Sequence, residues 1–193
     1  MARVLAVNNY PTKERFERLE KCVRGNGATV TSIDWSDVSA SKFDSYDGVV
    51  LSGSPDMLSD PKVAAKYSGE TEAIVDSKAT ILGVCFGHQM LARAFGAEVA
   101  KDGRPVLGMV KTRVLERDPL FDGLPNRLML LESRHEIVKS LPKGFRHLAK
   151  SETSRIAAMK HSIRPLYGVQ FHPERYTRKT QTATQSLGIS SGC

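Results

Sequence analysis

The chain has 193 residues, which is enough for one well-packed domain and short for two. Hydrophobic residues make up 40% of it, which argues against a disordered protein, and no apolar run approaches the roughly 20 residues that span a membrane. The formal net charge is +7, but the basic residues are scattered and no basic motif is interleaved with aromatic residues. We therefore expect no direct nucleic-acid binding and no membrane association.

Short apolar runs alternate with helical periodicity through the first half of the chain. The predicted strands there cover residues 3–7, 29–33, 48–51 and 80–84, and the predicted helices cover residues 13–24, 67–77 and 88–95. This alternation is typical of an α/β fold with a doubly wound, mostly parallel sheet flanked by helices. In such sheets the functional groups gather beyond the carboxyl ends of the strands.

The second half of the chain is richer in strand-like segments. We predict strands at 106–115, 127–131 and 145–149, followed by a hairpin of 156–160 and 166–171. These segments indicate a small antiparallel, strand-rich extension of the sheet. Residues 1–175 are predicted to form one domain, and 176–193 are predicted to be a polar C-terminal tail that is disordered or altered.

The chain contains three cysteines, Cys22, Cys85 and Cys193, which are too few and too far apart for a disulfide framework. This usage favours a reducing, cytoplasmic location. The N-terminal run is too short for a secretory signal. Neither the cysteines nor the histidines show the spacing of metal ligands, so no metal site is expected.

The most informative stretch is an apolar run that ends in Gly83-Val84-Cys85-Phe86-Gly87 and passes directly into a helical pattern. This is the layout of a nucleophile elbow, with Cys where Ser is usual. Glycines flank such a turn because it is strained and tightly packed. The start of the following helix favours a thiolate over a thiol. The alternative is a structural Cys that happens to lie between two glycines.

Two further segments follow predicted strands and can converge on this cysteine. The strand 166–171 runs into His172-Pro173-Glu174, so that His172 could accept the Cys85 proton and Glu174 could orient its ring. The strand 48–51 runs into Ser52-Gly53-Ser54-Pro55. Taken singly, a histidine at a strand end is more often structural, and this loop is an ordinary turn.

Together these motifs resemble the class I glutamine amidotransferase domain. The family signature pairs G-x-C-x-G-H-Q with a later F-H-P-E, and both are complete here, at 83–89 and 171–174. The segments 131–138, 157–161 and 167–174 are similar to the separate glutaminase subunit of archaeal GMP synthase. The resemblance covers the chain from about Val4 to Glu174.

The resemblance implies roles for residues around Cys85, His172 and Glu174. The N–H groups of Ser54 and Phe86, helped by Gly53, would form the oxyanion hole, although the family loop usually reads S-G-G-P and a positive φ at Ser54 would cost energy. Gln89 would contact the substrate glutamine. The amino-acid end of glutamine would be held by Ser133, Arg134 and His135.

This last assignment is open by one residue. The family usually reads S-H-x-D-x-V at this segment, whereas here Arg134 stands between Ser133 and His135 and Glu136 directly follows the histidine.

The resemblance further implies that Cys85, His172 and Glu174 hydrolyse glutamine to glutamate and ammonia. The ammonia would pass to a separate ATP-pyrophosphatase synthetase subunit, with XMP as the preferred acceptor for conversion to GMP. The chain has no pyrophosphatase loop of the S-G-G-V-D-S type. We therefore expect no cofactor in this chain, with ATP and Mg on the partner only.

Three alternatives remain open. The acceptor could be another molecule on another partner, because the motifs define glutamine rather than the acceptor. A γ-glutamyl peptidase or hydrolase would use the same chemistry, although Gln89 argues mildly against it. A non-catalytic regulator with the same fold is disfavoured by the intact Cys85, His172 and Glu174.

Overall fold

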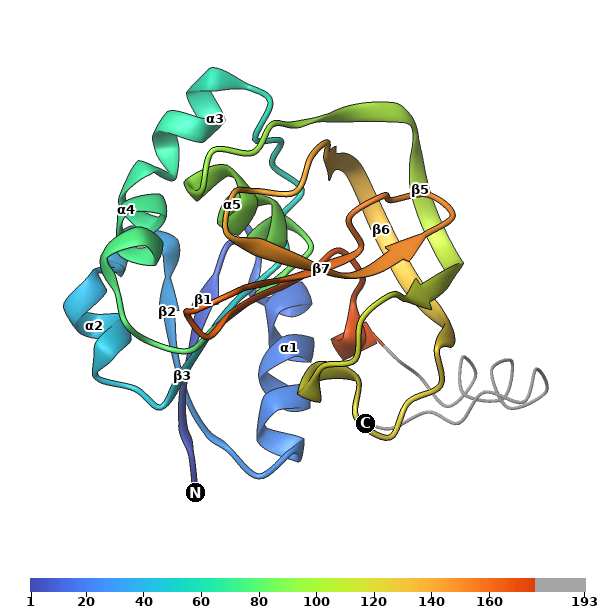
Figure 1. Cartoon of the computed structure of the whole chain (residues 1–193). Coiled ribbons are helices and arrows are strands. Elements are labelled where there is room, and N and C mark those ends of the chain that lie inside the picture. Colours follow the sequence, from blue (N-terminus) through green and yellow to red (C-terminus); the bar gives the residue numbers. More distant parts are fainter. Residues whose placement is uncertain (176–193) are drawn as a thin grey trace.

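The structure is a computed structural model, and it describes residues 1–175; the predicted tail and its boundary lie outside the described residues. It contains one nine-stranded sheet in the order β2-β1-β3-β4-β9-β8-β7-β5-β6 (Figure 1). The strands are β1 Arg3–Asn8, β2 Thr29–Asp34, β3 Gly48–Leu51, β4 Ile81–Val84, β5 Val99–Val114, β6 Arg127–Val138, β7 Phe145–Ser151, β8 Ala158–His161 and β9 Leu166–Val169.

Helices cover the sheet between the early strands. They are α1 Lys13–Gly25, α2 Ala40–Asp44, α3 Pro61–Lys66, α4 Ser68–Asp76 and α5 Phe86–Ala94, with short 3-10 turns η1 Trp35–Asp37, η2 Pro119–Phe121 and η3 Pro173–Arg175. The helix α4 confirms the one predicted at 67–77, and α1 confirms the one predicted at 13–24. The predicted α/β class is confirmed.

The first half of the sheet is parallel throughout. The pairs β1–β2, β1–β3, β3–β4 and β4–β9 all run in the same direction. Its central strands are almost continuously apolar because both faces are covered, as in β3 where Val49, Val50 and Leu51 are all buried. The carboxyl ends of β3, β4 and β9 therefore lie side by side at one edge.

Alternate residues of the parallel strands feed two separate cores. On one face, Leu5 and Val7 of β1 pack in a cluster that also contains α4 and α5 residues such as Ile74 and Met90. On the other face, Ala6 packs with Phe16 and Leu19 of α1. The helices thus cover both faces, as a doubly wound sheet requires.

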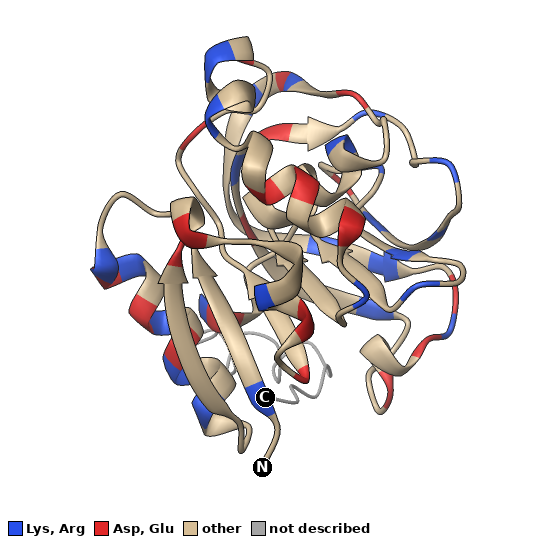
Figure 2. Ribbon diagram, turned by 90° about the vertical axis from the view of Figure 1, so that its left-hand side faces the viewer, with Lys and Arg blue, Asp and Glu red and all other residues tan. Residues whose placement is uncertain are grey.

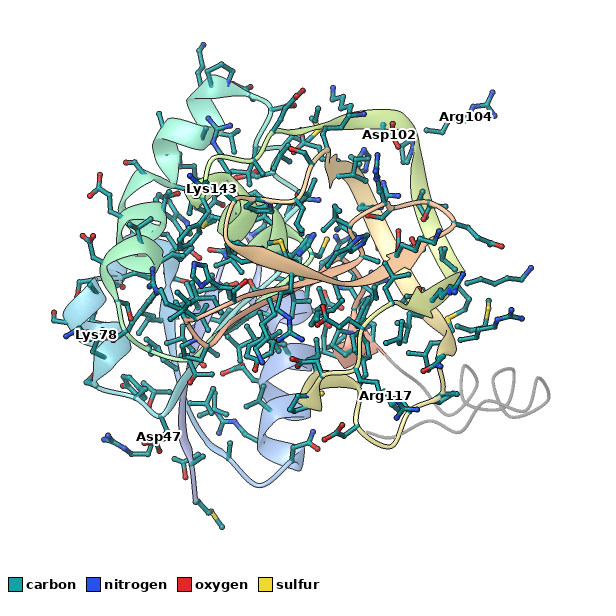
Figure 3. All side chains as sticks on the ribbon, in the orientation of Figure 1. Asp47, Lys78, Asp102, Arg104, Arg117 and Lys143 are labelled. Carbon is teal, nitrogen blue, oxygen red and sulfur yellow. The ribbon has the colours of Figure 1, made fainter. Side chains whose placement is uncertain are left out.

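The second half of the sheet is antiparallel, from β9 through β8, β7 and β5 to the edge strand β6. The predicted hairpin is formed by β8 and β9. The strand β5 begins at Val99 rather than residue 106, and β6 runs on to Val138 instead of ending at 131. Figure 3 shows Asp102 and Arg104 at the outer turn of β5, where the register with β6 shifts between Lys101 and Val106.

The charged side chains of the surface are mixed in sign. Figure 2 shows Lys and Arg interspersed with Asp and Glu along the helices and loops of the face that it presents. Within residues 1–175, no helix is both long and apolar enough to cross a membrane.

Candidate active site

Cys85 lies in the sharp turn between β4 and α5. The strand ends at Val84 and the helix begins at Phe86, two residues earlier than the sequence predicts. Cys85 has φ 54° and ψ −99°, and it is the one non-glycine residue with a positive φ among the described residues. Such backbone strain is held only where surrounding structure fixes it, and it is concentrated at functional sites.

Two glycines make this turn sterically possible. A Cβ at Gly83 would lie 2.4 Å from the carbonyl carbon and oxygen of Gly87, and a Cβ at Gly87 would lie 2.6 Å from the carbonyl oxygen of Leu51. Neither position can hold a larger residue unless the backbone moves. The Gly-x-Cys-x-Gly spacing is therefore a packing requirement of this elbow.

Cys85 lines a cavity of about 390 Å³ at the carboxyl ends of the parallel strands. Its side chain is buried, at 4% exposure, rather than lifted clear of the protein as the elbow pattern suggests. The cavity walls come from α1, the loop after β3, the middle of β6 and the turn at His172. A small molecule can thus reach the sulfur only by entering this cavity.

His172 and Glu174 meet Cys85 from the end of β9. The Nδ1 atom of His172 lies 2.7 Å from Oε1 of Glu174, and both side chains are buried. The backbone N–H of His172 donates to the carbonyl oxygen of Leu131 on β6, at 2.8 Å. This bond fixes the histidine between the parallel and the antiparallel halves of the sheet.

One backbone oxygen lies close to both the cysteine and the histidine. The carbonyl oxygen of Ser133 is 3.5 Å from Cys85 Sγ and 3.4 Å from His172 Nε2. Burial lowers the pKa of His172, but the negative charges of Cys85 and Glu174 and the hydrogen bonds to them outweigh it and raise that pKa to about 10. The geometry favours a protonated imidazole between two anionic groups.

The loop after β3 brings Gly53 and Ser54 to the cavity. A Cβ at Gly53 would lie 2.4 Å from the Tyr10 hydroxyl and 3.2 Å from His172 Cε1, so only glycine fits there. Ser54 has no positive φ, which removes the strain that its Cβ could have caused, and its Oγ accepts from the N–H of Asp56 at 3.1 Å. Serine in place of the usual second glycine is compatible with this backbone.

The expected oxyanion donors are free to act. Among the described residues, no acceptor is found for the backbone N–H groups of Gly53, Ser54 or Phe86. Phe86 is the first residue of α5, so its N–H has no partner within the helix. Whether these groups stabilise an oxyanion stays a prediction.

Gln89 lies one helical turn after Cys85 and is nearly fully buried on the cavity wall. Its side-chain nitrogen donates to the carbonyl oxygen of Glu136 at 2.7 Å and to Oε1 of Gln170 at 3.2 Å. Both contacts use the amide nitrogen, so the amide oxygen is the group that Gln89 can offer to a ligand. This position is compatible with the predicted substrate contact, which stays a prediction.

The segment 133–135 lies in the middle of β6, and its residues differ in what they present. Ser133 contributes its backbone carbonyl, whereas His135 is exposed at the cavity rim. Arg134 is buried, forms an ion pair with Glu132 at 2.8 Å and donates to the carbonyl oxygen of Thr153. Its side chain is thus engaged within the protein, while its predicted role in substrate binding is untested.

The sequence reasoning missed three residues of this cavity region. Tyr10 follows β1 at the same sheet edge, and burial together with the negative charges of Cys85 and Glu174 raises the pKa of its hydroxyl. Glu136 accepts from the N–H groups of Leu58 and Ser59 and so ties the loop after β3 to β6. Gln170 donates to Cys85 Sγ at 3.7 Å. Tyr10 could have been found from its place after a strand, as Ser52 was.

His88, the histidine of the elbow motif, lies away from the cavity. Its Nε2 lies 3.1 Å from the carbonyl oxygen of Ile156, and a Cβ at Gly168 would come within 2.6 Å of its Nδ1. Burial lowers the pKa of His88 to about 4, so the ring is neutral at physiological pH. It packs α5 against β8 and β9. Over residues 1–175, no group of three or more His, Cys, Asp or Glu side chains is arranged to hold a metal ion.

Comparison with known proteins gives consistent relatives. The family model of the class I glutamine amidotransferases matches residues 9–188. A subunit of the glutamine-hydrolyzing GMP synthase of Pyrococcus abyssi is 40% identical over 131 residues, which are 66% of this chain and 65% of that protein. The same subunit from Thermoplasma acidophilum is 35% identical over 144 residues, 75% of this chain and 71% of that protein. The chain thus spans less than two thirds of the Pyrococcus protein.

Solved structures share the fold. A Thermoplasma acidophilum protein assigned to this GMP synthase subunit superposes with a TM-score of 0.81 at 31% identity, covering 90% of this chain and 85% of that one. A glutamine amidotransferase of Thermotoga maritima superposes with a TM-score of 0.78 at 21% identity, covering 97% and 82%, and supports the fold alone. From the family match and the shared architecture, the chain belongs to the class I glutamine amidotransferases.

Proposed function

We propose that this chain is a glutaminase subunit, which hydrolyses the side-chain amide of glutamine and supplies ammonia to a separate synthetase. The observation that carries the proposal is the convergence of Cys85, His172 and Glu174 on one cavity, with unbonded N–H groups of Ser54 and Phe86 beside it. A strained cysteine at a helix N-terminus, a histidine and a carboxylate are the parts of a cysteine-nucleophile acyl-transfer site.

In the proposed reaction, Cys85 attacks as a thiolate on the amide carbon of glutamine. The amide oxygen becomes an oxyanion, which accepts hydrogen bonds from the N–H groups of Phe86 and Ser54, with Gly53 as a further donor. The protonated imidazole of His172 gives its Nε2 proton to the departing ammonia, and a γ-glutamyl thioester remains. The raised pKa of His172 supports this role, because the ring holds its proton until a basic leaving group arrives.

The second half of the reaction releases glutamate. Neutral His172 takes a proton from water, and the resulting hydroxide adds to the thioester carbon. Collapse of this second tetrahedral intermediate breaks the carbon–sulfur bond and restores the thiolate and the protonated histidine. Glu174, 2.7 Å from Nδ1, keeps the ring in the orientation that presents Nε2 to the sulfur.

The cavity has charges of both signs, as the zwitterionic end of glutamine requires. Arg15, Arg18 and Arg175 line it together with Glu14 and Asp56. The amide oxygen of Gln89 is a further polar group within reach of the substrate. We propose that these groups, with the backbone of Ser133 and the side chain of His135, hold the α-carboxylate and the α-ammonium group.

The proposed partner is an ATP-dependent synthetase that aminates XMP to GMP. Support comes from relatives named as one subunit of a glutamine-hydrolyzing GMP synthase, a name that implies at least one other subunit. ATP and Mg would act on that other chain. A pull-down that recovers such a synthetase would identify the acceptor, and recovery of an unrelated amidating enzyme would replace XMP.

The test of the proposed function is release of ammonia and glutamate from glutamine by the wild-type chain, with and without the partner. Cys85→Ala should remove all activity, and Cys22→Ala is the matched control, since Cys22 lies on α1. A glutamine-mimicking chloroketone should alkylate Cys85 and spare Cys22, although Cys85 is the more buried of the two. Hydrolysis of γ-glutamyl peptides without release of ammonia from glutamine would favour the peptidase alternative instead.

A further inference from the structure

A buried set of hydrogen bonds lies behind the loop that carries Gly53 and Ser54. Ser52 is completely buried, and its hydroxyl accepts from the backbone N–H of Asn9 at 2.8 Å. The same hydroxyl donates to the carbonyl oxygen of Gly53 at 3.0 Å. Because the hydroxyl accepts from Asn9, its own hydrogen is available for Gly53, and both bonds can form together.

The bond to Gly53 fixes the direction of the Ser54 N–H group. The carbonyl of Gly53 and the N–H of Ser54 belong to one planar peptide unit, and no cis peptide occurs in the described chain. In a trans peptide these two groups point in opposite directions. With the oxygen held toward the buried Ser52, the N–H points to the other side, and Ser54 lines the cavity there.

Ser52 also joins the two sides of the site. Its carbonyl oxygen accepts from the N–H of Gly87 at 3.2 Å, and Gly87 directly follows the other proposed donor, Phe86. The same oxygen accepts from Nδ2 of Asn9 at 3.4 Å. The loop after β3, the end of β1 and the start of α5 are therefore held by one residue.

Glu70 of α4 completes the set. Its Oε1 accepts from Nδ2 of Asn9 at 3.2 Å, and the side chain is 1% exposed. Its Oε2 and the Oδ1 of Asn9 have no hydrogen-bond partner among the described residues. Buried polar groups without partners are costly, so an apolar pair would be expected here if the site only had to be stable.

We propose that Ser52, Asn9 and Glu70 are positioning residues that hold the Gly53–Ser54 peptide with its N–H directed at the cavity. The inference rests on the proposed function, since the N–H matters only if an oxyanion forms at Cys85. None of the three side chains lines the cavity, so none is expected to touch glutamine. Their effect should appear in the transition state and not in substrate binding.

The variant Ser52→Ala removes the hydroxyl and leaves the peptide free to turn. Loss of one oxyanion donor lowers turnover by about 10²–10³-fold, so we expect kcat to fall by up to that factor while KM for glutamine changes little. Glu70→Ala should lower kcat in the same way by a smaller factor. Glu70→Gln keeps an oxygen for Asn9 Nδ2 and should recover most of what Glu70→Ala loses.

Ser77→Ala is the matched control for loss of a buried hydroxyl. Ser77 is also 1% exposed, donates to Oδ1 of Asp44 at 2.7 Å and accepts from the N–H of Ala79 at 2.9 Å, but it is remote from the cavity. The two serine variants should lose similar stability in urea unfolding. Only Ser52→Ala should lose turnover.

A crystal structure of Ser52→Ala gives a readout that does not depend on activity. We expect the Gly53–Ser54 peptide to be turned or to occupy two orientations. An unchanged peptide overturns the proposal, and so does unchanged kcat, or a rise in KM alone. Failure of the proposed function looks different, because the wild-type chain would then release no more ammonia than Cys85→Ala, while the crystal structures still decide the orientation. If Ser52→Ala does not fold, the Glu70→Ala and Glu70→Gln pair decides by the same two measurements.

Discussion

The parallel and the antiparallel halves of the sheet contribute different things to the site. The parallel half holds Cys85, Ser54 and Phe86 in backbone positions that close packing fixes, as the contacts at Gly83 and Gly87 show. The antiparallel half contributes β6, whose Ser133 carbonyl faces both Cys85 and the histidine. The comparison indicates that the chemistry is built on the rigid parallel strands, whereas the surroundings of the substrate are built on the long ribbon β5–β6.

The strand β9 is where the two halves meet. It pairs in parallel with β4 and antiparallel with β8, and His172 follows its end. The proposed base is therefore carried by one half and tied by its backbone N–H to the other, at Leu131. A change in either half can reach it.

The largest expected effect tests whether this junction carries the base. His172→Ala should lower kcat for glutamine hydrolysis nearly as much as Cys85→Ala, by on the order of 10⁴–10⁶-fold, because members of such a triad act as a unit. Glu174→Ala should be milder, since the orienting carboxylate does not move a proton. The measurement is kcat for all three variants. Equal and small losses for His172→Ala and an alanine variant of His135 at the rim would contradict the assignment.

How far the sequence predicts the molecule differs between the two halves. The elbow was predictable because its rule is local: Gly83 and Gly87 stand within two residues of Cys85 and have no room for a side chain. The alternation of strands and helices likewise predicted the parallel order. The start of α5 was misplaced by two residues because Cys85 itself makes the turn.

The extent of β6 was not predictable, because its buried residues are charged. Glu132 and Arg134 satisfy each other inside the protein, and Glu136 binds the backbone of another loop. A sequence pattern that reads charge as exposure ends the strand before them. The set formed by Asn9, Ser52 and Glu70 was missed for the same reason, since its partners come from three distant elements.

The second prediction addresses this buried pair in the antiparallel half. Arg134→Ala leaves Glu132 charged and buried without its partner, so we expect a loss of about 3–5 kcal/mol in the free energy of unfolding. Urea unfolding measures it. The double variant Glu132→Gln with Arg134→Met should recover part of the loss, because no unpaired charge then remains.

The same variants separate a structural role of Arg134 from substrate binding. If Arg134 also holds glutamine, the double variant will fold but show a raised KM with kcat kept. A double variant with normal KM would reject the predicted substrate contact of Arg134. The control is Lys139→Ala, which removes the exposed ion pair with Asp102 and should change stability by less than about 1 kcal/mol.

The third prediction concerns how the halves act together. We expect the isolated chain to be a weak glutaminase that a synthetase partner activates by about 10²-fold, a factor in the range of one lost transition-state interaction. The Ser133 carbonyl gives a physical reason, since without substrate it can accept from both Cys85 and His172 and so compete with their direct contact. Steady-state ammonia release with and without an XMP-loaded partner measures the activation. Full activity of the chain alone would contradict it.

The smallest effect contrasts the buried charges of the two halves. Glu132 in the antiparallel half has Arg134 as a partner, whereas Glu70 in the parallel half has only the amide of Asn9. Burial raises the pKa of Glu70 to about 8, although the bond from Asn9 opposes this. The folded protein therefore keeps the Glu70 proton at pH values where the unfolded chain releases it.

The sign follows from this difference in proton binding. Stability from Glu70 is fully present below its unfolded pKa of 4.5 and is lost as the pH rises toward 8, because the unfolded state then binds fewer protons than the folded state. Glu70→Gln cannot titrate and should not show this loss. Between pH 5 and 7 we expect the wild-type chain to lose about 2 kcal/mol relative to Glu70→Gln. Urea unfolding of both proteins at several pH values measures the difference. A constant difference across this range would mean that Glu70 is ionised in the folded protein and that its Oε2 finds a partner in solution.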